Sequence, residues 1–365
     1  MRIPAMPNAH SHAFQRGLRG RAERSGGHDD FWTWREQMYR LAGELDPASI
    51  ERVSFATFAE MAAAGYGVVG EFHYVHHRPD GSPYDDPGAT AKAVARAASR
   101  AGLRIVLLPA AYARAGPGRP PEQRQRRFCD PDVETYLERV DELRAWAESE
   151  DGITVGVAAH SPRAVPADWL AAIADYSERH GLVRHVHAAE QPRELEEVRA
   201  EHGCSPIELL DRTGFLGPLA SVVHAIHVDA RDIALLAERG ATVVSCPTTE
   251  GNLGDGHPPL IAFSDAGIPL AIGSDSQVRI DPFEEARELE TLARRAGLTR
   301  EALLSRSGDL WSELCRAGAR SLGIEEAQAG DVEIDTNHPD LRGVEPEDLR
   351  LALVTCASAG VVRSA

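Results

Sequence analysis

Two histidines separated by a single residue, His10 and His12, follow the first apolar run of the sequence. Alternate side chains of a β-strand share one face, so both imidazoles are expected to point the same way. Imidazole nitrogen is a preferred ligand of Zn²⁺, which makes the pair a candidate for metal binding. By itself, however, an H-x-H pattern also fits two hydrogen-bonded core histidines.

Polar side chains end three further apolar runs of the sequence. His185 and His187 alternate at the end of one run, Glu190 follows them, His224 ends the next run, and Asp275 follows the last. If the runs are parallel strands of a barrel, their carboxyl ends meet at one mouth. Packing alone does not explain polar residues at four strand ends, because burying them without partners costs free energy. The set therefore predicts a metal site, with His187 or His185 contributing a ligand.

The elements that must position these residues alternate regularly along the chain. The predicted strands are Arg2–Asn8, Tyr66–Phe72, Leu103–Pro109, Ile153–Ala159, Leu182–His187, Ser221–His224, Ala241–Cys246 and Pro269–Ile272. The predicted helices between them include Ile50–Ala64, Ala89–Ala101, Val133–Glu148, Ala167–Arg179 and Arg231–Arg239. Such alternation is typical of βαβ units, and eight strands favour an α/β fold of the closed (β/α)8 barrel type. An open doubly wound sheet is the alternative.

Two long insertions interrupt this alternation. Residues Arg16–Asp46 follow the first strand and contain the aromatic run Phe31-Trp32-Thr33-Trp34, and residues Ala113–Asp130 follow the third strand. Long loops at the carboxyl ends of barrel strands commonly build the active site. We therefore expect both insertions to border the pocket.

The end of the chain departs from the barrel pattern. A helical segment is predicted from Gly297 to about Leu322, followed by a short strand at Asp331–Ile334, one helix and a final apolar strand. We expect residues 1–322 to form the barrel and residues 323–365 to form a small C-terminal appendage.

The composition restricts the class of partner. The chain has 365 residues and a formal net charge of −17, which disfavours nucleic-acid binding because phosphate contacts need clustered Lys and Arg. No apolar stretch approaches the roughly 18 residues of a membrane span. The five scattered cysteines form no C-x-x-C pair, which favours reduced thiols in a cytoplasmic protein. A small anionic substrate remains compatible with the net negative charge of the chain, since a few local arginines suffice to bind it.

The pattern of strand-end residues resembles the amidohydrolase superfamily. Binuclear members of that superfamily carry a carboxylated lysine at the end of the fourth strand, or a glutamate in some branches. Here that strand ends Ala158-Ala159-His160-Ser161, and the single lysine, Lys92, falls on a predicted helix. The resemblance therefore implies a mononuclear site. The spacing of His187, Glu190 and His224 is similar to that of the deaminase branch.

Longer sequence blocks, spread over about residues 3–300, resemble the N-formimino-L-glutamate deiminase family within this superfamily. The blocks are Pro7-Asn8-Ala9-His10-Ser11-His12-Ala13-Phe14-Gln15-Arg16, Phe31-Trp32-Thr33-Trp34-Arg35-Glu36, Gly70-Glu71-Phe72-His73-Tyr74-Val75-His76-His77 and Pro247-Thr248-Thr249-Glu250-Gly251-Asn252-Leu253-Gly254-Asp255-Gly256. Members hydrolyse the formimino group to a formyl group and ammonia in histidine degradation. The same reaction is expected here, in a cytoplasmic homodimer.

The resemblance assigns roles to particular residues. It implies one Zn²⁺, or another divalent metal, bound by His10, His12, His187 and Asp275. It implies proton transfer by Glu190, His224 and Asp275. It implies substrate contacts from Gln15, Tyr74, His160, Arg163 and, less directly, Arg35. The arginines suit a substrate with two carboxylates, because guanidinium groups bind carboxylates bidentately.

Some features leave alternatives open. A related deaminase acting on a purine, pyrimidine or triazine ring would share the metal site, and an inactive relative would bind metal without turnover. The histidines His73, His76 and His77 are interpreted as loop packing rather than as a second metal site. Glu250 and Asn252 are expected to border the pocket without a catalytic role.

The resemblance also implies a departure from the family pattern at both ends of the chain. Members carry a segment before the H-x-H motif that forms a small β-sandwich with the C-terminal tail. Residues 323–365 are accordingly expected to be a truncated remnant of that sandwich, which would expose apolar surface.

Overall fold

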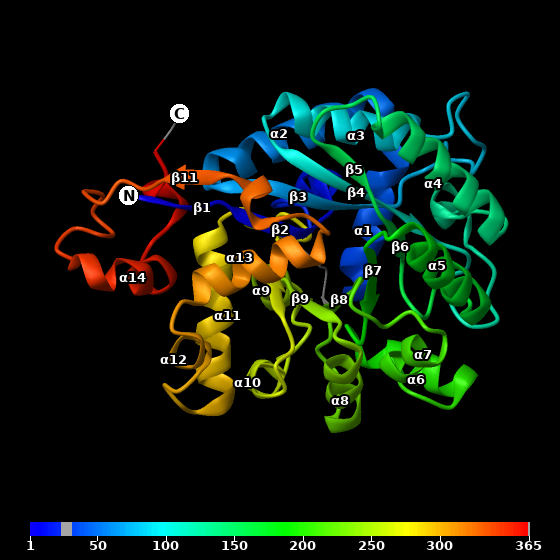
Figure 1. Cartoon of the computed structure of the whole chain (residues 1–365). Coiled ribbons are helices and arrows are strands. Elements are labelled where there is room, and N and C mark those ends of the chain that lie inside the picture. Colours follow the sequence, from blue (N-terminus) through cyan, green and yellow to red (C-terminus); the bar gives the residue numbers. More distant parts are fainter. Residues whose placement is uncertain (23–30, 364–365) are drawn as a thin grey trace.

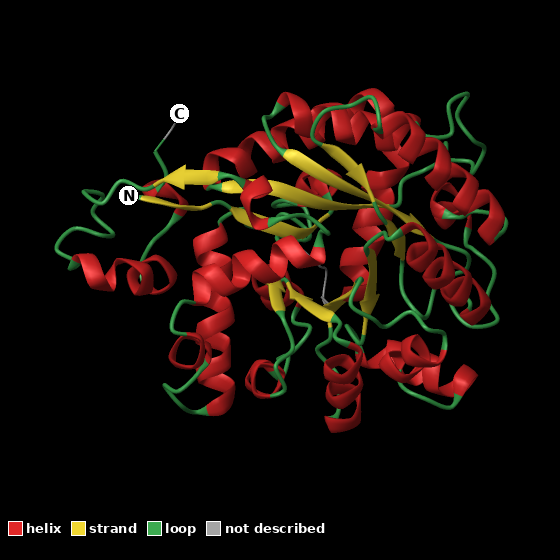
Figure 2. Cartoon of the chain, viewed as in Figure 1, coloured by secondary structure: helices red, strands yellow, loops and turns green. Residues whose placement is uncertain are grey.

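Parallel strands and helices alternate around a closed barrel in the computed structural model, which describes residues 1–22 and 31–363 (Figures 1 and 2). Neighbouring strands follow the order β10-β9-β8-β7-β6-β4-β3-β2, and β5 also pairs with β4. The strands are β2 (Met6–Ser11), β3 (Tyr66–His73), β4 (Arg104–Ala111), β5 (Ile153–Val155), β6 (Val157–Ala159), β7 (Arg184–Ala188), β8 (Ala220–His224), β9 (Thr242–Ser245) and β10 (Leu270–Ile272). The predicted (β/α)8 barrel is confirmed.

The helices surround this barrel and cover its strands. They are α2 (Pro47–Ala64), α3 (Ala89–Arg100), α4 (Val133–Ala147), α5 (Ala167–His180), α6 (Pro192–His202), α7 (Pro206–Arg212), α8 (Ala230–Arg239), α9 (Pro247–Leu253), α10 (Leu260–Asp265) and α11 (Pro282–Gly297). Local chemistry sets their ends. Asp46 accepts a hydrogen bond from the Ser49 amide at the start of α2, and Gly65 ends that helix in the left-handed conformation. The five helices predicted in these regions are confirmed to within a few residues.

The first predicted strand, Arg2–Asn8, is two strands with different partners. β1 (Arg2–Pro4) pairs antiparallel with β11 (Asp331–Glu333), whereas β2 enters the barrel at Met6. The change of partner occurs at Ala5, whose amide donates to the Gly330 carbonyl. Continuity of the apolar run concealed this change, because Ile3 of β1 is buried like the residues of β2.

The fourth predicted strand, Ile153–Ala159, is interrupted at Gly156 between β5 and β6. A Cβ atom at Gly156 would lie 2.8 Å from the Val183 carbonyl oxygen, so a side chain does not fit there. The Gly156 amide still donates to the Leu107 carbonyl at 2.9 Å. The interruption therefore shifts the pairing along β4 without opening the barrel.

Both predicted insertions lie at the carboxyl ends of strands. The first contains η1 (Ala13–Leu18) and α1 (Phe31–Glu44), and the second contains η2 (Gln123–Phe128). Residues 23–30 of the first insertion lie outside the described part of the chain. Contacts between α1 and both 3-10 segments bring the insertions together over the mouth of the barrel.

The predicted helix after Gly297 is two helices, α12 (Leu303–Ser307) and α13 (Leu310–Ser321), separated at Gly308 with a φ of +73°. Helix α13 packs against β2, β9 and β10 near the amino ends of the strands. There Gly318 lies against Pro7, since a Cβ atom at this glycine would be 2.9 Å from the Pro7 side chain.

The tail contains η3 (Glu326–Ala329), β11, η4 (Pro346–Asp348), α14 (Leu349–Thr355) and η5 (Ala359–Val361). The predicted final strand is wrong. Instead of a strand, the chain forms η5 and a single bridge between Ile334 and Val362. The division into a barrel at 1–322 and an appendage at 323–365 stays a prediction. None of the described helices is long and apolar enough to cross a membrane.

Candidate metal centre

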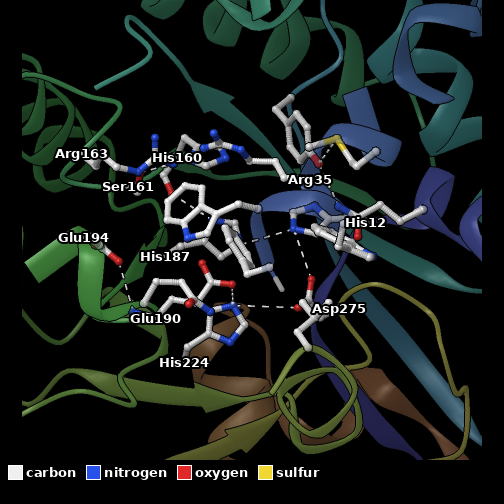
Figure 3. A pocket seen from close by; sticks show the side chains of 18 of the residues that line it. His12, Arg35, His160, Ser161, Arg163, His187, Glu190, Glu194, His224 and Asp275 are labelled. Atoms are coloured by element: carbon white, nitrogen blue, oxygen red, sulfur yellow. Dashed lines mark hydrogen bonds and ion pairs between the residues drawn. The ribbon is translucent and has the colours of Figure 1, made fainter. Parts of the chain in front are cut away.

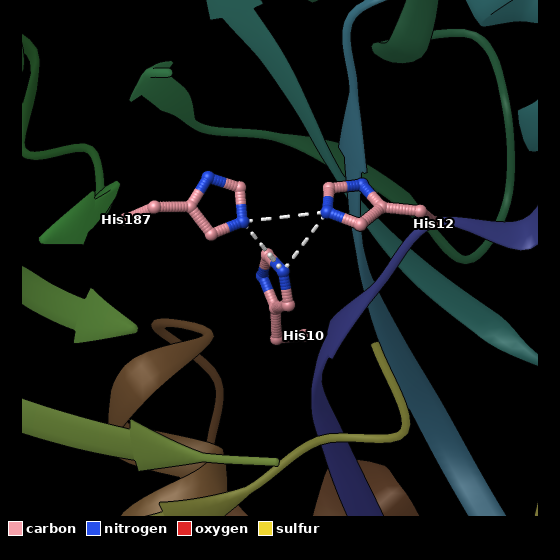
Figure 4. A group of neighbouring side chains, drawn as sticks. All are labelled: His10, His12 and His187. Atoms are coloured by element: carbon pink, nitrogen blue, oxygen red, sulfur yellow. Dashed lines mark hydrogen bonds between the residues drawn. The ribbon is translucent and has the colours of Figure 1, made fainter. Parts of the chain in front are cut away.

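The carboxyl ends of β2 and β7 bring three imidazoles together at the barrel mouth (Figure 4). Their Nε2 atoms are separated by 3.2 Å between His10 and His12, 3.3 Å between His12 and His187, and 3.0 Å between His187 and His10. Beside them, Oδ1 of Asp275 lies 3.6 Å from the His10 Nε2 atom and 3.4 Å from that of His12. The four predicted ligands therefore lie around one point.

The hydrogen bonds of His12 and His187 leave two of the three converging nitrogens without protons. The Nδ1 atoms of His12 and His187 lie 2.7 Å and 2.9 Å from the backbone carbonyls of Phe72 and His160. Because a carbonyl only accepts, each Nδ1 carries the proton, and the Nε2 lone pair of a neutral ring is free to bind a metal. Facing lone pairs repel each other unless a cation lies between them.

The spacing of these donors fits a tetrahedral divalent ion. Bonds of about 2.0–2.1 Å to a tetrahedral Zn²⁺ place two ligand nitrogens about 3.3 Å apart. Burial lowers the pKa of His10, His12 and His187, so the neutral form required of a ligand is favoured. Three histidines and one carboxylate are thus a donor set that fits such an ion.

His185, the alternative ligand, lies one layer deeper in the barrel. Its Nε2 atom is 2.8 Å from the Ser321 carbonyl on α13. Because His185 precedes His187 by two residues on β7, it shares the same face but points at the helix that packs against the amino ends of the strands. Its Nε2 nitrogen is already hydrogen-bonded there.

Next to the three histidines, a second group centres on His224 at the end of β8 (Figure 3). Its Nε2 atom lies 3.6 Å from Oε1 of Glu190 and 3.9 Å from Oδ2 of Asp275. Its Nδ1 atom lies 3.2 Å from Oε1 of Glu250. His224 is therefore surrounded by three carboxylates and links Glu190 to the predicted metal ligand Asp275.

Sequence reasoning placed Glu250 at the border of the pocket and missed its position behind His224. Glu250 is buried on α9, where it accepts hydrogen bonds from the Cys246 amide at 2.7 Å and the Ser245 hydroxyl at 2.8 Å. These bonds fix the carboxylate that holds the His224 ring. The only available indication was the order of the strands, since β9 follows β8 in the barrel.

The charges around His224 shift its titration. Burial by itself lowers the pKa of the imidazole, but the neighbouring carboxylates of Glu190, Glu250 and Asp275 outweigh it and raise the pKa to about 10. Burial likewise raises the pKa of Glu190, against the attraction of His224. The pair thus contains a histidine that readily takes a proton and an acid that readily keeps one.

Backbone strain is concentrated at these strand ends. His224 and Asp275 have φ values of +75° and +44°, in the left-handed region that non-glycine residues rarely adopt. Such conformations cost on the order of 1–3 kcal/mol each and are found mostly at functional sites. No sequence pattern predicted them.

The five predicted substrate residues line one pocket together with His12, His187, Glu190, His224 and Asp275 (Figure 3). The pocket encloses about 730 Å³, including the space at its open mouth. On one wall, Nε2 of Gln15 donates to the Tyr74 hydroxyl at 2.8 Å. The centre of the His160 ring lies 5.7 Å from that of Tyr74 and 4.5 Å from that of Tyr112.

Two guanidinium groups line this pocket near the ring of Trp32. Arg35 on α1 lies 4.5 Å from the ring centre of Trp32, and Arg163, after β6, lies 5.9 Å from it. Arg163 also donates to the Ala115 carbonyl at 2.9 Å. Nε and Nη1 of Arg35 have no hydrogen-bond partner among the described residues. The first insertion thereby supplies one of the two cations at the pocket.

The other histidine cluster, after β3, is arranged differently. Nε2 of His73 lies 3.1 Å from the Thr90 hydroxyl, Nε2 of His76 lies 2.9 Å from the Ala110 carbonyl, and Nε2 of His77 lies 3.4 Å from Asp130. Each ring is therefore bonded to a different protein group. Loop packing, rather than a second metal site, stays the interpretation of this cluster.

Comparison with known proteins agrees with the barrel. A model of the amidohydrolase family matches residues 1–333, and the chain belongs to this family. It is 39% identical over 360 residues to formimidoylglutamate deiminase of Pseudomonas aeruginosa, covering 95% of this chain and 79% of that protein. The predicted family is therefore confirmed.

More distant relatives share the barrel. A 5-methylthioadenosine/S-adenosylhomocysteine deaminase of Archaeoglobus fulgidus is 29% identical over 273 residues, covering 75% of this chain and 58% of that protein. Among solved structures, an amidohydrolase from Brucella melitensis superposes with a TM-score of 0.90 at 33% identity, covering 99% of this chain and 84% of that one. An adenosine deaminase from Xanthomonas campestris, solved with bound zinc, superposes with a TM-score of 0.81 at 23% identity, covering 99% of this chain and 77% of that one.

Proposed function

We propose that this chain hydrolyses the formimino group of N-formimino-L-glutamate to N-formyl-L-glutamate and ammonia. The observation that carries the proposal is the pocket, which is lined by His12 and His187 of the three-histidine centre together with two guanidinium groups. This combination suits a substrate with one hydrolysable carbon–nitrogen bond and two carboxylates. The 39% identity to a formimidoylglutamate deiminase supports the same substrate.

One divalent cation, proposed to be Zn²⁺, would be held by His10, His12, His187 and Asp275. When bound, such a cation activates a water molecule by lowering its pKa toward neutrality. The donor set of three imidazoles and a carboxylate also accepts iron or manganese.

The reaction requires protons to move from oxygen to nitrogen. Water adds to the formimino carbon, the bond from that carbon to the terminal nitrogen breaks, and the nitrogen leaves as ammonia carrying both protons of the water. Glu190 and His224, whose Oε1 and Nε2 atoms are 3.6 Å apart, are placed to carry these protons. Glu250 keeps the His224 ring in position through Nδ1.

The substrate carboxylates would be bound by Arg163 and Arg35. Gln15, Tyr74 and His160 line the same pocket, where they would hold the linear chain of the substrate. Trp32 packs against both guanidinium groups and would limit their movement.

The direct test is ammonia release from N-formimino-L-glutamate by zinc-loaded protein, beside a Glu190→Gln variant. Because a positioned acid or base contributes about 10²- to 10⁴-fold, turnover should fall by that factor in the variant while bound zinc stays at one per chain. Adenosine and triazine substrates serve as comparison. Ammonia from a ring substrate, but none from the linear one, would overturn the proposal.

We further propose that the enzyme acts in histidine degradation, in the cytoplasm and as a homodimer. All five cysteines are free in the structure, which agrees with a reducing compartment. Metal analysis and analytical ultracentrifugation of protein purified without added metal would test the native ion and the dimer.

A further inference from the structure

The barrel closes between β2 and β10, and this closure has an unusual backbone pattern. In the described residues one isolated bridge joins Ser11 of β2 to Asp275, just after β10, whereas β3 and β4 pair at six consecutive positions. The His12 amide donates to the Asp275 carbonyl at 3.0 Å, and the Asp275 amide donates to the His10 carbonyl at 3.1 Å. The backbone contacts at the closure thus join the proposed ligands directly.

Side chains supply the remaining connections across this closure. Nδ2 of Asn8 on β2 donates to the Ser274 hydroxyl at 2.7 Å, and its Oδ1 accepts from the Ser274 amide at 3.0 Å. Nε2 of Gln277 donates to the Ser11 hydroxyl at 3.0 Å and to the Asp275 carbonyl at 2.7 Å. The Ser274 hydroxyl completes the connection by donating to Oε1 of Gln277 at 2.9 Å.

A carboxyl group from the neighbouring strand extends this network. Glu71 on β3 accepts from the Ser11 hydroxyl at 2.6 Å and from the Ala13 amide at 2.7 Å. These two residues flank His12 in the sequence. The H-x-H segment is therefore bonded to β3 on one side and to the Gln277 loop on the other.

The network is buried and well satisfied. The side chains of Asn8, Glu71, Ser274 and Gln277 belong to residues that are at most 1% exposed. Apolar residues could close a barrel without the cost of burying polar groups, so a satisfied polar network indicates a requirement for defined geometry. Closeness of the strands is also required, since a Cβ atom at Gly273 would lie 2.7 Å from the His10 carbonyl oxygen.

The backbone at this point is strained. Asp275 and Gln277 have φ values of +44° and +65°, and the Gln277 side chain bonds the Asp275 carbonyl between them. Without such bonds the segment would relax toward ordinary φ values and rotate the Asp275 carboxylate.

We propose that Asn8, Glu71, Ser274 and Gln277 form a polar latch that fixes His10, His12 and Asp275 relative to one another and so sets the affinity for the metal. The latch rests on the ligand set of the proposed function. Its members are positioning residues, since they act through the ligands and do not reach the pocket.

The test is Gln277→Met, which keeps the length of the side chain and removes its bonds to Ser11, Asp275 and Ser274. The apparent Kd for Zn²⁺, measured by competition with a chelator, should rise about 10- to 100-fold, as for other groups that orient metal ligands. The visible spectrum of the Co²⁺-substituted protein should change as well. The matched control is Asp130→Asn in the His77 region, which should lower stability and leave both readouts unchanged.

Glu71→Gln is the second variant, should Gln277→Met fail to fold. At nearly constant volume it leaves one acceptor oxygen for two donors, the Ser11 hydroxyl and the Ala13 amide, and weaker Zn²⁺ binding is again expected. If a latch variant folds and its Kd for Zn²⁺ and its Co²⁺ spectrum equal those of the wild type, the proposed role of the latch is overturned. A wild-type protein that binds one Zn²⁺ but releases no ammonia would overturn the proposed substrate alone. If the wild type binds no Zn²⁺, the ligand set and the latch both fail.

Discussion

The described part of the chain contains two buried groups of three histidines, and the groups differ in which ring nitrogen is hydrogen-bonded to the protein. At the barrel mouth, Nδ1 of His12 and of His187 bonds a backbone carbonyl, and the Nε2 atoms converge. After β3, Nε2 of His73 and of His76 is the atom that meets a protein group, as is Nε2 of His77. Histidine density is therefore a poor guide to a metal site, and the partner of each ring nitrogen is a better one.

The largest effect is expected from removing one of the converging imidazoles. His187→Ala should weaken Zn²⁺ binding by more than the roughly 100-fold seen when a supporting group is lost, because the ligand itself disappears. Ammonia release should fall to background. Zinc content after dialysis measures the loss of Zn²⁺ binding, and a turnover assay measures the loss of ammonia release. A variant that keeps one tightly bound Zn²⁺ would break the distinction between the two groups.

The next largest effect is expected from an ion pair beside the histidine group that follows β3. Asp130 bonds Arg139 through both carboxylate oxygens, and both residues are buried. Asp130→Asn leaves the Arg139 charge without a counterion, so the free energy of unfolding should fall by about 3–5 kcal/mol. Urea denaturation of zinc-loaded protein measures this loss. Zinc affinity should not change, and a weakened Kd would show that the two groups are coupled.

A pH effect follows from His73. Burial lowers the pKa of this imidazole to about 3. Between that value and the unfolded pKa near 6.5 the unfolded chain binds the extra proton, so His73 removes stability as the pH falls through this window, by up to about 1.4 kcal/mol per pH unit. The difference in unfolding free energy between wild type and His73→Gln, measured at pH 7, 6 and 5, should shift in favour of the variant. A constant difference would mean that folding does not shift the pKa of His73 and would contradict this expectation.

The smallest effect is expected from the same His73→Gln variant at pH 8. Since His73 is neutral there and bonds Thr90 at 3.1 Å, an amide of similar size should cost only about 1 kcal/mol. Zinc stoichiometry should stay at one per chain, as judged by metal analysis. A loss of bound zinc would assign this group to metal binding after all.

Local patterns in the sequence predicted most of the fold and the main residues of the centre. The strand periods and helix caps are short-range properties, so the barrel and its helices followed from them. The positions of His10, His187, His224 and Asp275 at strand ends followed too, because parallel strands end at one edge. The division of the first apolar run at Ala5 did not, since the run is continuous in the sequence and the change of pairing partner depends on distant segments.

What the sequence determined by itself is therefore the type of chemistry: apolar strands that end in imidazole and carboxylate, arranged for a barrel mouth. Tertiary structure alone decided which ring nitrogens are free, that Glu250 stands behind His224, and that Gln277 bonds the segment carrying Asp275. The physical reason is that each of these depends on hydrogen bonds between segments distant in the chain, whose directions are set only when the barrel closes.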